Sequence, residues 1–281
     1  MRNWMGSWPA LWRALLSVVI GAIALPAGPG LAAEADEDLL PSAESVIEKS
    51  IEVMGGREAF AKIKNRVSYG TLEIPLLKVK GPITVYEAPP SKTYSLAEIE
   101  GLGKIESGSD GTVCWESSTM AGPRLLEGEE KAVAERLNAF NRATEWKKYY
   151  KSAETKGIET IDGRLHYKIV LTPNAGLPET IFYDRRTFLP TKIELTLRGP
   201  RGEIPMEVFS FDFKKVDDIL LPHKQVTRAA EVEQIVILNT IKHDQDFPAD
   251  RFALPEAIKA LAERAKTTAP ATAPAAAPGK P

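Results

Sequence analysis

The regular alternation of apolar and polar residues between positions 164 and 198 constrains the fold of this chain more than any other feature. Every second residue is apolar in two stretches, Leu165, Tyr167, Ile169, Leu171 and Ile193, Leu195, Leu197. Because side chains alternate between the two faces of a strand, this period indicates strands with one buried face. A short apolar run at 181–183 lies between them, bounded by turn-forming residues. We therefore predict a three-stranded antiparallel meander in which Lys192, Glu194, Thr196 and Arg198 point into water.

The same strand-like pattern recurs through most of the chain. Further strands are predicted at 67–77, 81–88, 92–106, 112–118, 152–159, 204–213, 220–229 and 231–242. The stretch at 120–126 is predicted to be a loop that interrupts the sheet.

The last strands differ from the meander because both of their faces carry apolar side chains. Met206 and Val208 alternate with Phe209 and Phe211, and Ile235 and Ile237 alternate with Val236 and Leu238. A strand that is apolar on both faces must be covered on both. We expect either helices or a hydrophobic ligand to cover the second face.

Helical spacing of apolar residues occurs in three places. It predicts a helix over 41–64 that is broken at Gly55-Gly56, a helix over 129–146 and a short helix over 256–266. Trp146, Tyr149 and Tyr150 cluster where the second helix ends, and we interpret them as an aromatic seal between helix and sheet, with the lining of a ligand pocket as the alternative. The fold class is therefore α+β and mostly β, with helices packed on a long antiparallel sheet.

The first 35 residues have the parts of an export signal. Arg2 and Arg13 supply positive charge, an apolar run follows at 14–25, and Ala33-Glu34-Ala35 fits a cleavage site. A membrane anchor is disfavoured, because the apolar run of about a dozen residues is shorter than the roughly 20 that a spanning helix needs. We predict a signal peptide at 1–35, one domain at 36–266, a disordered Ala/Pro-rich tail at 267–281 and a periplasmic location.

Charge and cysteine content exclude several classes of protein. The formal net charge is −2 and there is no basic cluster, which argues against binding to nucleic acid. Cys114 is the only cysteine, so no internal disulfide can form and the fold must rest on its hydrophobic core.

Motifs for catalysis or metal binding are missing from the sequence. It has no G-x-S-x-G, no H-E-x-x-H, no C-x-x-C and no phosphate-binding loop. We therefore predict a protein that is not an enzyme, with no catalytic residue, no metal and no cofactor. An enzyme is the minor alternative, and it would require two or more of Asp110, His166, Glu194 and His243 to converge in one cleft.

Several short features occur in a fixed order between residues 41 and 255. After the export signal come the helix ending at Gly55-Gly56, Asp110-Gly111 with Cys114-Trp115, the segment from Ile181 to Asp184 with Leu189-Pro190, Leu220-Leu221-Pro222 and Phe252-Ala253-Leu254-Pro255. In this order they resemble the outer-membrane lipoprotein-sorting (LolA/LolB-like) family and its uncharacterised periplasmic relatives. The resemblance implies a strongly curved, incomplete antiparallel β-barrel with helices across its concave face and an apolar cavity between them. It also implies binding of lipoprotein acyl chains, which members with an assigned role carry across the periplasm.

These observations lead to a functional hypothesis. We expect a monomeric periplasmic protein that binds a hydrophobic ligand, either a lipid or an acylated lipoprotein, and carries it between envelope membranes, with envelope membrane proteins as further partners. The residues predicted to line the cavity are Trp115, Phe209, Phe211, Ile237, Ile193 and Leu195. The alternative is a structural or adaptor protein of the cell envelope whose helices permanently fill the concave face.

Overall fold

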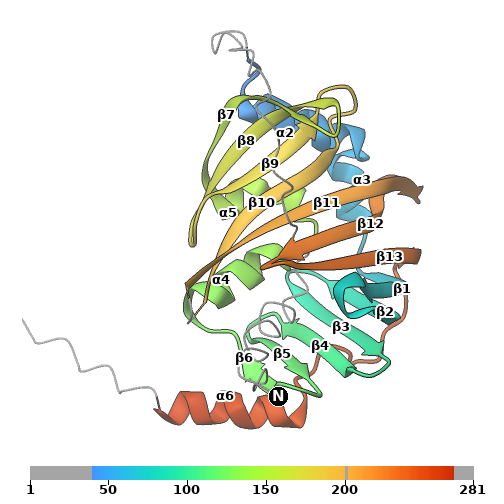
Figure 1. Ribbon diagram of the computed structural model, residues 1–281, viewed down its shortest axis with the longest axis vertical. Helices are drawn as coiled ribbons and strands as arrows, with labels where there is room; N and C mark the ends of the chain where they lie inside the picture. The colour runs from blue at the N-terminus through green and yellow to red at the C-terminus, as the bar shows by residue number, and fades with distance from the viewer. Residues whose placement is uncertain (1–39, 200–201, 269–281) are drawn as a thin grey trace, which may run out of the picture.

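The computed structural model describes residues 40–199 and 202–268, which form one sheet with helices packed on it (Figure 1). The strands are β1 (Arg66–Ile74), β2 (Val79–Ala88), β3 (Lys92–Ile99), β4 (Gly103–Asp110), β5 (Cys114–Ser118), β6 (Gly122–Leu125), β7 (Tyr150–Ile161), β8 (Arg164–Pro173), β9 (Glu179–Asp184), β10 (Pro190–Gly199), β11 (Gly202–Val216), β12 (Ile219–Ala229) and β13 (Val232–His243). The helices are α2 (Ala43–Val53), α3 (Gly56–Lys62), α4 (Gly128–Leu137), α5 (Trp146–Tyr149) and α6 (Glu256–Thr268), with 3-10 turns η2 (Pro75–Leu77) and η3 (Arg142–Glu145).

The predicted export signal lies outside the described residues, and so does the tail from residue 269 onward. Helix α6 continues to Thr268, two residues into the segment that was predicted to be tail. The division of the chain into a signal, one domain and a tail stays a prediction.

All thirteen strands belong to one open antiparallel sheet. Its strand order is β6-β5-β4-β3-β2-β1-β13-β12-β11-β10-β9-β8-β7. Two meanders, β1 to β6 and β7 to β13, are joined where β1 pairs with β13, with Leu72 opposite Val236. In Figure 1 the sheet curves around α4, which lies between the two meanders. The predicted fold class, an open curved antiparallel sheet with helices across its inner side, is confirmed.

The two faces of the sheet have different neighbours. We call the face that α2 and α4 cover the inner face and the opposite one the outer face. Val46 and Ile51 of α2 pack with Ile169 of β8 on the inner face. Leu137 of α4 packs with Leu195 of β10 on the same face. These contacts explain the apolar stripes that predicted the helices.

The break between α2 and α3 lies at Gly55, as the sequence predicted. Gly55 has a φ of +125°, and a Cβ atom there would lie 2.4 Å from the carbonyl oxygen of Asp218. The neighbouring Met54 carbonyl accepts a hydrogen bond from the Leu220 N–H at 2.8 Å. Glycine is required because the chain must approach the β11–β12 turn with a positive φ.

Three boundaries differ from the predictions. The single strand predicted at 92–106 is two strands, β3 and β4, because Gly101 and Gly103 adopt φ values of +80° and +78° and turn the chain. The predicted loop at 120–126 contains β6, which pairs with β5. The helix predicted over 129–146 ends at Leu137, and Asn141 with a φ of +55° separates it from η3 and α5.

The segment after β13 covers the outer face of the first meander. Tyr86, Tyr94 and Trp115 form an aromatic row there, with ring centroids 6.3 Å apart at each step. Phe247 packs edge-on against Tyr86 at 5.2 Å, and the Arg251 guanidinium lies 4.4 Å from the centre of the Tyr86 ring. Helix α6 follows and lies beside β6, as Figure 1 shows.

Asp184 organises the turn between β9 and β10. Its Oδ1 accepts hydrogen bonds from the N–H groups of Arg186 and Thr187, both at 2.9 Å, although the residue is only 2% exposed. Burial by itself would raise the pKa of this carboxyl, but the hydrogen bonds from Thr187 and Arg186 lower it below its usual value.

We expect Asp184→Ala to lower the free energy of unfolding by about 1–3 kcal/mol at neutral pH, because two N–H groups lose a charged acceptor. The charged carboxylate stabilises the fold above the unfolded-state pKa of about 3.9, and this contribution is lost as the pH falls through the lower folded-state value. Denaturation of the wild type and the variant at neutral and acid pH measures the difference. A difference that stays constant across this range would contradict the assignment.

Candidate functional site

A central cavity of about 290 Å³ lies between the inner face of the sheet and helix α4. Its lining comes from both meanders and from the segment between α4 and η3. The lining residues are Ser68, Ile83, Val85, Glu87, Thr93, Ser95, Ser107, Leu137, Asn138, Arg142, Ile193, Leu195, Val208, Gln225, Val236 and Leu238. Most of the apolar side chains come from β10 to β13, whereas the serine and threonine hydroxyls come from β1, β3 and β4.

Two of the six residues predicted to line the cavity do line it. Ile193 and Leu195 of β10 face α4 across the cavity. The alternation in the opening meander therefore predicted the correct residues for the inner face of this strand.

The other four predicted residues lie on the outer face, so their assignment to the cavity lining is corrected. Side chains alternate along a strand, so residues paired across strands share a face. Phe209 pairs with Lys192 and Ile237 pairs with Lys224, one position away from the inner residues Val208 and Val236. By the same rule Phe211 belongs to the outer face. Trp115 packs on Tyr94 in the outer aromatic row.

Long basic side chains cover these outer aromatic rings. The Arg228 guanidinium lies 4.9 Å from the centre of the Phe209 ring, and Lys224 Nζ lies 5.7 Å from that of Phe211. Phe182 is fully buried on this face, with Lys192 Nζ 5.2 Å from its ring centre. Aliphatic stems and cations thus cover part of the second apolar face of the late strands, while Phe211 and Ile237 stay 39% and 41% exposed.

Lys192 corrects a further expectation, since it was predicted to point into water. It is only 9% exposed, and its Nζ lies 2.6 Å from carboxylate oxygens of both Glu194 and Glu207. The stem fills the space between two aromatic rings, and the two carboxylates compensate for the desolvation of its charge.

A buried charge network fixes the C-terminal end of α4 above the cavity. The carboxylate of Glu179 on β9 has no exposed surface and lies 3.1 Å from Arg136 Nη2 and 3.4 Å from Arg142 Nη1. Tyr150 donates its hydroxyl proton to the same carboxylate, and burial raises the pKa of this phenol. Arg136 also donates to the Ala175 carbonyl at 2.9 Å. We call Arg136, Arg142, Tyr150 and Glu179 the α4 clamp.

The N-terminal end of α4 is held by a second set of charges. Arg124 of β6 pairs with Glu130 of α4 at 2.6 Å and with the buried Glu116 of β5. Arg198 of β10 lies 3.6 Å from Glu129. Ion pairs therefore fix α4 to strands of both meanders, and the helix bridges the hollow of the sheet.

A smaller cavity of about 90 Å³ lies beneath α2 and adjoins the central one. Both cavities include Arg142 and Ile193 in their lining. Trp146 and Tyr150 close the smaller cavity between α2 and the sheet. This arrangement is the aromatic seal that the sequence predicted.

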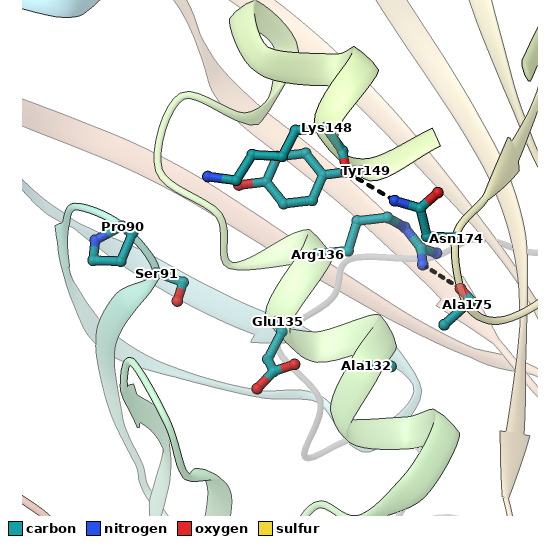
Figure 2. A pocket seen from close by; sticks show the side chains of 9 residues that line it. All are labelled: Pro90, Ser91, Ala132, Glu135, Arg136, Lys148, Tyr149, Asn174 and Ala175. Atoms are coloured by element: carbon teal, nitrogen blue, oxygen red, sulfur yellow. Dashed lines mark hydrogen bonds between the residues drawn. The ribbon is translucent and has the colours of Figure 1, made fainter. Parts of the chain in front are cut away.

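Figure 2 shows a third pocket, of about 300 Å³, on the opposite side of α4. Ala132, Glu135 and Arg136 line it from α4, whereas the central cavity is lined by Leu137 and Asn138. With 3.6 residues per turn these two sets lie on opposite sides of the helix. The remaining wall comes from the β2–β3 turn, the end of α5 and the β8–β9 loop. The Arg136 guanidinium is already paired with Glu179. This pocket is therefore a surface hollow beside the α4 clamp.

The four residues that the enzyme alternative would bring together do not share a cavity. Asp110, His166, Glu194 and His243 line none of the three cavities described above. His243 contacts Asp217 at 2.7 Å, and His166 pairs with Asp184 on the outer face. In the described part of the chain, no three His, Cys, Asp or Glu side chains are grouped so that they could hold a metal ion.

Comparison with known proteins finds solved structures with a similar fold. No protein-family model and no curated protein matches this chain. The solved structure of a LolA superfamily protein from Nitrosomonas europaea aligns with 76% of this chain and 99% of its own, at 16% identity and a TM-score of 0.52. A DUF1329 family protein from Desulfovibrio piger aligns with 75% and 96% of the two chains, at 12% identity and a TM-score of 0.51. The predicted resemblance to the lipoprotein-sorting family is therefore confirmed for the fold.

No helix in the described ranges combines the length and the apolar character that crossing a membrane requires.

Sequence analysis missed the α4 clamp and the hydroxyl side of the cavity. Arg136 occurs in a helix rich in charged residues, and Glu179 follows a predicted loop, so neither has a local signal of burial. Thr93 and Ser95 alternate with Tyr94, which indicates that the hydroxyls and the ring lie on opposite faces of the strand. The pattern does not say which face is buried, because small hydroxyl residues are also common on exposed surfaces.

We expect Glu179→Gln to lower the free energy of unfolding by about 3–5 kcal/mol, because Arg136 and Arg142 would stay buried without a carboxylate. Glu154→Gln is the matched control, since Glu154 is an exposed residue of β7 that pairs with Lys156, and it should change this free energy by less than about 1 kcal/mol. Chemical denaturation at neutral pH compares the two variants. Equal losses in both would contradict the role of the clamp.

Proposed function

We propose that this protein is a periplasmic binding protein for a hydrophobic ligand, a lipid or an acylated protein. The observation that carries the proposal is the central cavity, which α4 covers and which side chains from both meanders leave unfilled. Ile193, Leu195, Val208, Val236 and Leu238 offer an apolar wall to such a ligand.

The chemistry of an acyl chain suits this wall. Each CH₂ group removed from water contributes roughly 0.8 kcal/mol. Binding of this kind needs no catalytic group, in keeping with a role that is not enzymatic. Carriage of the ligand between envelope membranes, with membrane proteins of the envelope as partners, is the finer form of the proposal, and it agrees with the LolA-type fold. We propose that the protein acts as a monomer.

The alternative of an adaptor protein predicts a concave face filled by helices. Helix α2 fills the space over β7 to β9 in this way, but a cavity remains under α4. This remaining volume favours a binding protein over an adaptor.

The periplasmic part of the proposal depends on the predicted signal peptide. After expression of the full chain in a Gram-negative host, we expect the protein in the periplasmic fraction with its N-terminus near Asp36. Cell fractionation and mass spectrometry of the intact protein measure both. An uncleaved chain in the cytoplasmic fraction would reject export.

We expect Ile193→Trp to reduce the affinity for an apolar fluorescent probe at least about tenfold, because the larger ring occupies the cavity. Overpacking of this kind costs about 1–3 kcal/mol of stability, so folding is verified by circular dichroism. Ile237→Trp is the matched control, because Ile237 is 41% exposed on the outer face, and its probe affinity should equal that of the wild type. Fluorescence titration measures both affinities.

Native mass spectrometry of the protein purified from periplasm tests the proposal directly. A lipid that co-purifies with the wild type and is lost in Ile193→Trp supports it. If no lipid co-purifies and no apolar probe binds, the proposal is wrong.

A further inference from the structure

Four hydroxyl groups line one side of the central cavity. They belong to Ser68 of β1, Thr93 and Ser95 of β3, and Ser107 of β4. Ser95 pairs directly with Ser107, and Val85 lies between Ser95 and Ser68 in the same row of the sheet. Side chains paired in this way have Cβ atoms about 4.5–5.5 Å apart, so Ser95 and Ser107 can engage one polar group together.

These hydroxyls lack partners within the protein. Ser68 is 3% exposed and Ser95 is 6% exposed, whereas Thr93 and Ser107 are half-buried. Within residues 40–199 and 202–268 none of the four hydroxyls makes a hydrogen bond. The neighbouring Ser109 differs, because its Oγ accepts a hydrogen bond from the Gly111 N–H at 3.0 Å. Hydroxyls that line a cavity and have no partner in the protein are available to hydrogen-bond to a ligand or to water.

The charged groups near the cavity already have partners in the protein. Arg142 contacts Glu179, and Arg66 lies 3.3 Å from Glu87 and 3.4 Å from the Asn141 side-chain oxygen. Arg142, a cation of the cavity lining, shares the single Glu179 carboxylate with Arg136, so its charge is only partly compensated. The hydroxyls can donate to a carbonyl oxygen or accept from a hydroxyl group.

The volume limits the size of the ligand. About 290 Å³ corresponds to roughly ten water-sized groups at about 30 Å³ each. The cavity thus accommodates one short chain, with mainly apolar contacts on the β10 to β13 side, where Gln225 also lines it, and hydrogen bonds on the β1 to β4 side.

From these observations we propose that Ser68, Thr93, Ser95 and Ser107 form a polar subsite that binds the ester or hydroxyl group of a single-chain amphiphile, such as a short-chain monoacylglycerol. This inference rests on the proposed function, because it assigns the ligand class of the same cavity. The ester or hydroxyl group lies in the central cavity beside the four hydroxyls, and the chain contacts the apolar wall.

Displacement of a bound apolar fluorescent probe tests the subsite. The competitors are a monoacylglycerol, the free fatty acid and the terminal alkene, all of the same chain length, at neutral pH. We expect the monoacylglycerol to bind the wild type more tightly than the alkene does, because only its ester and hydroxyl groups can hydrogen-bond to the subsite. In the double variant Ser95→Ala/Ser107→Ala its affinity should fall roughly tenfold, since each lost hydrogen bond contributes about 0.5–1.5 kcal/mol. Affinity for the alkene should stay within about twofold.

Ser117→Ala is the matched control, because Ser117 pairs with Glu106 and belongs to the outer face of β5. It should leave all three affinities unchanged. If the double variant binds the monoacylglycerol as well as the wild type does, or loses alkene binding to the same extent, the polar subsite is wrong while the hydrophobic cavity stands. If the wild type binds no apolar probe at all, the proposed function fails and the subsite fails with it.

Discussion

The pairing of β1 with β13 is the constraint on which the rest of the structure depends. Every other strand pair joins strands that follow one another in the chain, whereas this pair joins the first strand to the last. The entropic cost of closing such a long loop grows only slowly with length, and the gain is one continuous sheet with a common inner face. Ser68 and Leu238 thereby line the same cavity although they belong to different meanders.

The two faces of that sheet are buried in different ways. Helices α2 and α4 cover the inner face, while the C-terminal segment and the stems of basic residues cover much of the outer one. Phe209 and Phe182 need no helix above them, because Lys192 and Arg228 lie across the rings and keep their charges paired with carboxylates. An apolar strand face therefore does not by itself indicate a ligand.

Helix α4 bridges the hollow with charges rather than with a continuous apolar seam. The clamp around Glu179 and the contacts of Arg124 with Glu130 fix its two ends, so the helix covers a volume that its own side chains do not fill. Buried ion pairs add little net stability, but they define a geometry strictly, because a misplaced partner leaves a buried charge. Because these ion pairs fix the position of α4, the short helix does not move into the cavity beneath it.

The sequence by itself determined most of the strands, the break at Gly55 and the division of β10 into an inner set with Ile193 and an outer set with Lys192. It predicted one strand where Gly101 turns the chain, and it assigned Trp115 and Phe209 to the cavity. Only the tertiary structure decided which face is inner where both sets are apolar, because a period of two separates the faces without saying what covers each. The α4 clamp and the unpartnered hydroxyls also arise only from contacts between distant strands and helices, since burial of a polar group depends on neighbours that local sequence does not specify.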